Sequence, residues 1–180
     1  MPRVYSTNLP TVKVPHQARW ITFRSSRECA SADVIYVFTD GSSLGGFAAV
    51  MVESGGFYDG WQGWQKPTPT RNVAAELNGV LLGLSKLPPW AHEVVVVSDY
   101  LGPAAWLTGN WKIKKVEVGN LVAAIQEVIA AFDLAVTFVH HKGHQKDDSA
   151  FTRWNVLADR HAGNKQPGVF RIKQPGYSPG

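Results

Sequence analysis

The sequence predicts an α/β fold in which a mixed sheet of five strands, three antiparallel and then two parallel, is flanked by helices. The first observation behind this prediction is a set of three apolar runs, at 34–38, 47–52 and 57–64, joined by short glycine-bearing connections. Connections this short require antiparallel neighbours. The second observation is that two further apolar runs, at 94–97 and 134–139, alternate with segments of helical periodicity, a pattern typical of parallel strands.

The chain before these strands has a weaker pattern. Residues 1–33 show no sustained period of 2 or 3.6, although 20–23 fit a short added strand. From Val34 onwards the apolar pattern becomes regular, and glycines mark the two turns that join the first three strands. We therefore treat residues 1–33 as a basic N-terminal extension of unknown role.

A helix is predicted at 72–87, because its apolar residues recur at spacings of three and four: Val73, Leu77, Val80, Leu81 and Leu84. Asn72 is a plausible N-cap, and the Pro88-Pro89 pair ends the helix. Glu76 lies beside the apolar stripe, where the helix can present it to an edge of the sheet. Taken alone, Glu76 is better explained as an ordinary first-turn acid favoured by the helix dipole.

The remaining elements complete the predicted domain. Helical segments are expected at 103–107, 121–132 and 154–161. Beyond residue 163 the chain is rich in proline and glycine, which predicts flexibility. The predicted organisation is thus a folded domain at 34–163 between the N-terminal extension and a flexible basic tail at 164–180.

The positive charge of the chain is concentrated in its two ends. Residues 1–33 carry five basic and two acidic side chains, and residues 160–180 carry four basic and none acidic. Residues 34–159 carry nine basic and twelve acidic side chains. Basic ends of this kind either keep a protein soluble or attract a polyanion such as nucleic acid, and composition leaves both explanations open.

The cellular setting is indicated by what the chain lacks. The single cysteine, Cys29, excludes an internal disulfide and agrees with a reducing compartment. No apolar run approaches the ~20 residues needed to cross a bilayer, and no signal-peptide segment follows Met1. We expect a cytoplasmic protein with no membrane partner, and a monomer.

Two of the predicted strands end in an acid. Asp40 follows the apolar run at 34–38, and Asp99 follows the four valines at 94–97, which are typical of a fully buried strand. Adjacent buried strands that both end in an aspartate hold two carboxylates side by side on a rigid edge. Such a pair is suited to binding hard divalent cations.

Five short motifs occur in a fixed order along the chain. They are Thr39-Asp40-Gly41-Ser42 after the first strand, Ala75-Glu76-Leu77 in a helix that starts Arg71-Asn72, Ser98-Asp99-Tyr100 after the valine strand, Lys142-Gly143-His144 after the last strand, and Ala158-Asp159 in the closing helix. This ordered set, from about residue 34 to residue 161, resembles ribonuclease H of type I. The resemblance implies an RNase H-like fold and an endonuclease that hydrolyses the RNA strand of RNA–DNA hybrids.

The resemblance also implies a role for each acid. It makes Asp40, Glu76, Asp99 and Asp159 the ligands of two Mg²⁺ ions, for which Mn²⁺ can substitute, with Asp40 bridging both ions. Two ions roughly 3.5–4 Å apart stabilise the attacking and the leaving oxygen of a phosphodiester together. His144 matches the family's mobile-loop histidine, which assists proton transfer or product release.

Substrate contacts are implied as well. Gly41, Ser42 and Asn72 are candidates for reading the RNA 2′-hydroxyl across a wide, shallow minor groove. Further along, one segment resembles a shortened form of the family's basic, tryptophan-bearing protrusion, which contacts the DNA strand: Trp106, Trp111, Lys112, Lys114 and Lys115. Its lysines neutralise phosphates, from which most affinity comes.

Several features depart from the family pattern. Tyr100 stands where a serine is common, the glycine-rich turn after Asp40 is short, and the loop between His144 and Asp159 is long. His140 and His141 have no counterpart and are interpreted as loop residues. Two alternatives stay open: a related DNA nuclease of the same fold, such as a junction resolvase or transposase-like enzyme, and a non-catalytic hybrid-binding module.

Overall fold

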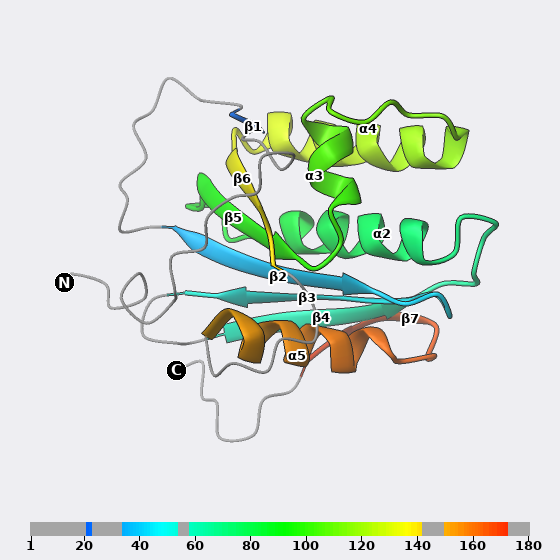
Figure 1. Cartoon of the computed structure of the whole chain (residues 1–180). Helices are drawn as coiled ribbons and strands as arrows, with labels where there is room; N and C mark the ends of the chain where they lie inside the picture. The colour runs from blue at the N-terminus through cyan, green and yellow to red at the C-terminus, as the bar shows by residue number, and fades with distance from the viewer. Residues whose placement is uncertain (1–20, 23–33, 54–57, 142–149, 173–180) are drawn as a thin grey trace.

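The computed structural model of the chain describes residues 21–22, 34–53, 58–141 and 150–172. Its strands are β1 (Ile21–Thr22), β2 (Ile35–Gly41), β3 (Gly46–Val52), β4 (Tyr58–Trp64), β5 (Glu93–Ser98), β6 (Ala135–His140) and β7 (Gly168–Arg171). Its helices are α2 (Asn72–Ser85), α3 (Gly102–Leu107), α4 (Val116–Ala131) and α5 (Ala150–Ala162) (Figure 1). From β2 to α5 the elements follow the predicted order.

All of the described strands belong to one mixed sheet, in the order β1-β6-β5-β2-β3-β4-β7. The strands β2, β3 and β4 are antiparallel neighbours, as their short connections require. On the other side of β2, the strands β5 and β6 run parallel to it and to each other. The predicted fold class, a mixed sheet of antiparallel and then parallel strands flanked by helices, is confirmed.

The sheet is wider than predicted, because β1 and β7 extend its two edges. The two residues of β1 pair antiparallel with β6, within the stretch at 20–23 that fitted a short added strand. The four residues of β7 pair antiparallel with β4, where the sequence predicted a flexible tail. The four residues of β7 are all exposed, and they lack the alternation of apolar and polar residues by which a half-buried strand is predicted. The sequence pattern therefore does not predict this strand, which is defined by its pairing with β4 in the folded protein.

Residue Ile172, just after β7, anchors the end of the sheet. Its side chain is buried in the core, and its backbone N–H donates to the Gly60 carbonyl at 2.7 Å. A truncation meant to remove the basic tail therefore has to begin after Ile172 and not at residue 164.

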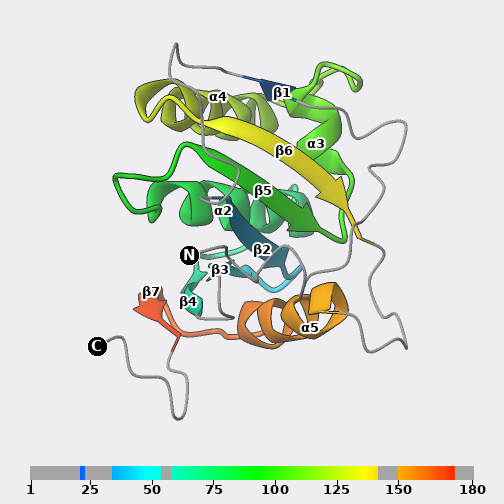
Figure 2. The same cartoon turned by 90° about the vertical axis from the view of Figure 1, so that its left-hand side faces the viewer.

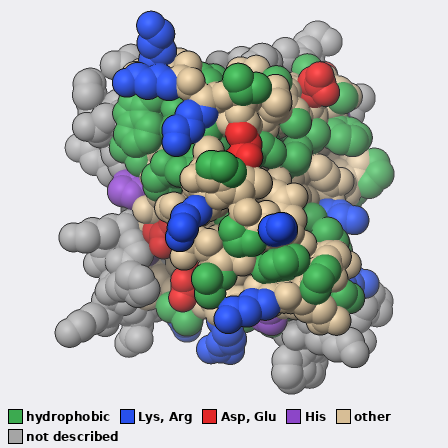
Figure 3. Space-filling view, turned by 90° about the vertical axis from the view of Figure 1, so that its right-hand side faces the viewer, with side chains coloured by type: hydrophobic (Ala, Val, Ile, Leu, Met, Phe, Trp, Pro, Cys, Tyr) green, Lys and Arg blue, Asp and Glu red, His purple; other side chains and the backbone are tan. Residues whose placement is uncertain are grey.

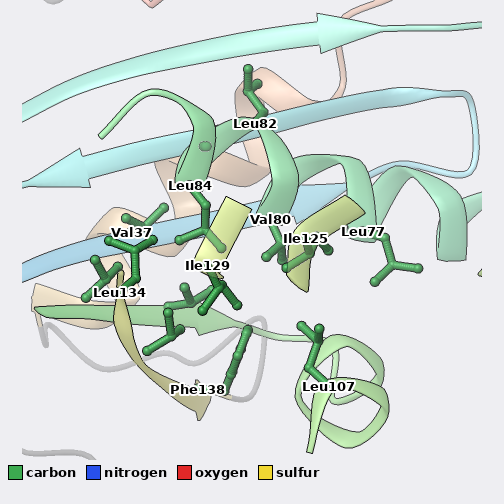
Figure 4. Packing of buried hydrophobic residues seen from close by; sticks show 14 of the residues in the cluster. Val37, Leu77, Val80, Leu82, Leu84, Leu107, Ile125, Ile129, Leu134 and Phe138 are labelled. Carbon is green, nitrogen blue, oxygen red and sulfur yellow. The ribbon is translucent and has the colours of Figure 1, made fainter. Parts of the chain in front are cut away.

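The sheet separates two hydrophobic layers. The helices α2, α3 and α4 cover one face and α5 covers the other (Figures 1 and 2). On the first face, apolar side chains of α2 and α4 pack together above β2, β5 and β6, and the cluster includes Leu77, Val80, Leu84, Ile125 and Ile129 (Figure 4). On the second face, Phe38 and Val50 pack with Ala158 and Trp154 of α5. None of the helices in the described ranges has the length and apolar character needed to span a membrane.

The start of α2 differs from the prediction. Asn72 is the first residue of the helix, and the N-cap position is taken by Arg71, which has φ 46° and makes no side-chain capping hydrogen bond within the described residues. The Val73 amide instead donates to the Thr70 carbonyl at 3.0 Å. The side chain of Asn72 is exposed at this end of the helix.

Candidate active site

The register of the central parallel strands brings Asp40 and Asp99 together. Thr39 of β2 is paired with Ser98 of β5, so the next residue on each strand lies at the same level of the sheet. The carboxyl ends of parallel strands share one edge, which is why two acids distant in sequence become neighbours. Asp40 is 6% exposed, and Asp99 is half-buried.

Glu76 reaches the same edge because α2 lies unusually close to the sheet. A Cβ atom added at Gly79 would come within 2.9 Å of the Asp40 carbonyl oxygen, and one at Gly41 would come within 2.3 Å of the Glu76 amide nitrogen. Any larger residue at either glycine would push the helix and the end of β2 apart. This close approach buries Glu76, which is only 5% exposed, against the end of β2.

The three carboxyl groups form a tight cluster. One carboxylate oxygen from each of Asp40, Glu76 and Asp99 lies within 4.8 Å of the other two. Asp159 approaches from α5, on the opposite face of the sheet, and its side chain is in hydrogen-bonding contact with Asp40. All four predicted acids therefore meet at one place, although Asp159 is exposed and lies at the rim of the cluster.

Burial and the neighbouring acids disfavour the charged form of the carboxyl groups in the cluster. Burial, followed by the nearby Asp99 carboxylate, raises the pKa of Asp40 from its ordinary value of 3.8 to about 8. Burial is also the main cause that raises the pKa of Glu76 well above its ordinary value, with the charges of Asp40 and Asp99 adding to it. The Gly41 amide opposes both shifts by donating to these carboxylates, at 2.9 Å in the case of Asp40.

The donor set fits divalent cations. Glu76 Oε2 is buried and has no hydrogen-bond partner among the described residues, so an oxygen ligand is available at the centre of the cluster. Hard cations such as Mg²⁺ prefer carboxylate oxygens and retain several of their waters, and a bound cation relieves the repulsion among the acids. These residues thus form a candidate metal centre.

Three of the seven predicted substrate-binding residues, Lys112, Lys114 and Lys115, line a cavity of about 290 Å³ beside this cluster. Its lining includes Thr70, Tyr100, Trp106, Lys112, Lys114 and Lys115. Trp111 is 39% exposed, so it is not a core residue. Its ring packs edge-on against that of Trp106, with ring centroids 5.6 Å apart. Figure 3 shows the end of the molecule at which β2 ends and α2 begins, where Lys and Arg side chains surround hydrophobic ones.

Two other predicted substrate-binding residues, Ser42 and Asn72, do not line this cavity. Ser42 lies in the β2–β3 turn, where its hydroxyl accepts a hydrogen bond from the Leu44 amide at 3.1 Å. Asn72 is exposed between Thr70 and Val73, which both line the cavity. His144 lies outside the described residues.

One contact that the sequence did not reveal joins the two walls of the cavity. Glu117, in the first turn of α4, accepts hydrogen bonds from the hydroxyls of Thr68, at 2.5 Å, and Thr70. These bonds, that of Thr68 first, lower the pKa of Glu117 below its ordinary value. No local pattern indicates such a contact, because 47 residues separate Thr70 from Glu117.

A protein-family model matches most of the chain and so identifies its family. The family model of RNase H matches residues 32–166. The chain belongs to the RNase H family. The resemblance found in the sequence motifs is thereby confirmed, and the four acids lie inside the matched range. No curated protein sequence matches this RNase H chain significantly.

Solved structures share the fold. RNase H1 from the halophilic archaeon Halobacterium salinarum matches with a TM-score of 0.57 and 18% identity, over 71% of this chain and 93% of that one. LC11-RNase H1, isolated from compost by a metagenomic approach, matches with a TM-score of 0.58 and 21% identity, over 71% and 91%. The same compost enzyme in complex with an RNA/DNA hybrid gives a TM-score of 0.55 at 19% identity, over the same shares.

Proposed function

We propose that this RNase H domain hydrolyses the RNA strand of RNA–DNA hybrids with two bound Mg²⁺ ions. The observation that carries the proposal is the convergence of three carboxylates from β2, α2 and the turn after β5 within 4.8 Å of one another. Membership of the RNase H family supports nuclease activity. The hybrid as substrate is supported by the similar fold of LC11-RNase H1, whose complex contains an RNA/DNA hybrid.

Each acid has a distinct part in this proposal. Asp40, hydrogen-bonded to Asp159 and with a carboxylate oxygen within 4.8 Å of those of Glu76 and Asp99, would hold both ions. Glu76, Asp99 and Asp159 would supply the remaining carboxylate ligands. Bound Mg²⁺ would supply charge stabilisation and an activated water. His144 is proposed to assist proton transfer or product release.

The chain's own residues also orient the substrate. The cavity is lined by Tyr100, Trp106 and the three lysines, and Tyr100 directly follows Asp99 in the chain, so a strand held there would lie near the carboxylates. Gly41, Ser42 and Asn72, at the end of β2 and the start of α2, are proposed to contact the RNA strand in its minor groove. Exposed lysines and Trp111 are proposed to contact the DNA strand.

The direct test is cleavage of an end-labelled RNA–DNA hybrid in Mg²⁺, in Mn²⁺ and in chelator. Duplex RNA, duplex DNA and a four-way DNA junction serve as parallel substrates. We expect metal-dependent cutting confined to the RNA of the hybrid. Cutting of the junction would instead identify a resolvase-like nuclease, and hybrid binding without turnover in either metal would identify a binding module.

The lysine segment gives a separate prediction about affinity. Replacing Lys112, Lys114 and Lys115 together with Gln is expected to weaken hybrid binding and to reduce the slope of log K against log salt by about 2–3, because each lost phosphate contact removes about one released counterion. Fluorescence anisotropy of a labelled hybrid between 50 and 200 mM salt measures the slope. Lys86, exposed at the opposite end of α2, provides the matched control as Lys86→Gln. Equal slopes for the triple variant and the control would remove the lysines from the interface.

A further inference from the structure

Two consecutive histidines, His140 and His141, lie at the end of β6 beside the carboxylate cluster and have no part in the chemistry proposed above. His140 is the last residue of β6 and is paired with Ser98 of β5, the residue before Asp99. Its ring Nε2 lies 3.0 Å from the Asp99 carbonyl oxygen. A carbonyl oxygen only accepts hydrogen bonds, so Nε2 carries the proton and donates it to the backbone of Asp99.

His141 connects the same turn to α5. Its backbone N–H donates to the Ser98 carbonyl at 2.8 Å, and its ring Nε2 lies 3.2 Å from the hydroxyl of Thr152. Thr152 is buried in the first turn of α5, at 8% exposure, and it lies seven residues, or about two turns, before Asp159 on the same side of that helix. In Figure 2 the end of β6 lies near the end of α5 at which the helix begins.

The acids differ in how firmly the fold holds them. Asp40 lies on a central strand and Glu76 on a buried helix face, whereas Asp99 lies on an irregular turn between β5 and α3 and Asp159 is an exposed residue of α5. Like charges in the cluster repel one another, and this repulsion pushes the acids on the less constrained elements outwards. The hydrogen bond from the Tyr100 amide to Ser98 Oγ at 3.0 Å and the bond from the His141 amide to the Ser98 carbonyl also restrain the Asp99 turn.

We propose that His140 and His141 are positioning residues: His140 fixes the Asp99 turn, and His141 fixes α5, and with it Asp159, relative to that turn. The inference rests on the proposed function, because it assigns metal ligation to both acids. Groups that orient the ligands of a metal typically change its affinity by 10- to 100-fold when they are removed. Because the contacts run through backbone and hydroxyl groups, we expect effects at the lower end of this range.

The first test compares His140→Leu with His140→Gln in the full chain at pH 8. Glutamine keeps an N–H donor at a similar distance from the backbone, whereas leucine removes it. Titration of the protein with Mn²⁺ by calorimetry, without nucleic acid, is expected to show about tenfold weaker binding for His140→Leu and a change within about twofold for His140→Gln. The melting temperature in chelator, measured on the same samples, reports a purely structural role.

The second test addresses the link to α5. His141→Leu and Thr152→Val each remove one partner of the same contact, so the double variant is expected to bind Mn²⁺ no more weakly than the more affected single variant. Additive losses would show that the two side chains act separately and would overturn the role of His141.

The outcomes separate this inference from the proposed function. Wild-type Mn²⁺ affinity in His140→Leu, with or without a lower melting temperature, overturns the positioning role even if the wild-type protein cuts hybrids. If His140→Leu weakens Mn²⁺ binding as expected but the wild-type protein leaves hybrids uncut, the proposed function is refuted and the inference is supported. A wild-type protein that binds no Mn²⁺ overturns both.

Discussion

Replacing Asp40 with Asn is expected to reduce hybrid cleavage by about 10³-fold or more while leaving the fold intact. Asp40 is hydrogen-bonded to Asp159, lies within 4.8 Å of the Asp99 and Glu76 carboxylates and is proposed to bridge both ions. Its loss therefore removes several kcal/mol of transition-state stabilisation, and each ~1.4 kcal/mol corresponds to a factor of ten. Asparagine has the same shape as aspartate and carries no charge. The fold is therefore preserved while metal binding fails.

Single-turnover cleavage of the hybrid, with circular dichroism on the same samples, measures this effect. Asp133→Asn provides the matched control, because Asp133 is exposed at the far end of α4 and its φ of 55° is one that asparagine adopts readily. The control should cut at the wild-type rate. An Asp40→Asn protein that still cuts hybrids would refute the assignment of the active site.

The second large effect concerns stability against pH in the absence of metal. Because burial and neighbouring acids raise the pKa of Asp40 to about 8 in the folded state, the folded protein binds more protons than the unfolded chain between about pH 4 and pH 8. The free energy of unfolding must therefore fall as the pH rises through this window. The raised pKa of Glu76 acts in the same direction. We expect the metal-free melting temperature to decrease steadily from pH 5 to pH 8.

Magnesium should reverse this loss at the upper end of the window. Metal binds the deprotonated carboxylates, so its affinity rises with pH, and at about 100 times its Kd it should raise the melting temperature at pH 8 by about 5–10 °C and have little effect at pH 5. Thermal melts at both pH values, with magnesium and with chelator, measure the difference.

The Asp40→Asn variant supplies the control for the stability experiment. It removes the ionisation of Asp40 and relieves Glu76 of a neighbouring charge, so its metal-free stability should depend less on pH and exceed that of the wild type at pH 8. A pH profile equal to that of the wild type would show that the carboxylate cluster does not control the stability of the metal-free protein.

Local patterns in the sequence determined the elements that bear the site. The apolar runs that end in Asp40 and Asp99 form β2 and β5, and the three- and four-residue spacing around Glu76 forms α2. Hydrophobic periodicity and the glycine and proline residues between elements identify such strands and helices, because both are short-range properties of the chain. The order of the motifs also identified the family, which the match over residues 32–166 confirms. The assigned roles of the site residues stay predictions.

The tertiary structure decided how close these elements come and which further groups hold them. The register of β2 on β5 sets Asp40 beside Asp99, and the glycines at 41 and 79 let α2 bring a Glu76 carboxylate oxygen within 4.8 Å of theirs. The pairing of β7 with β4 and the ring contacts of His140 and His141 leave no local trace in the sequence. The physical reason is that the sequence pattern records which face of an element is apolar, whereas hydrogen bonds and close backbone contacts between distant segments arise only when those faces pack together.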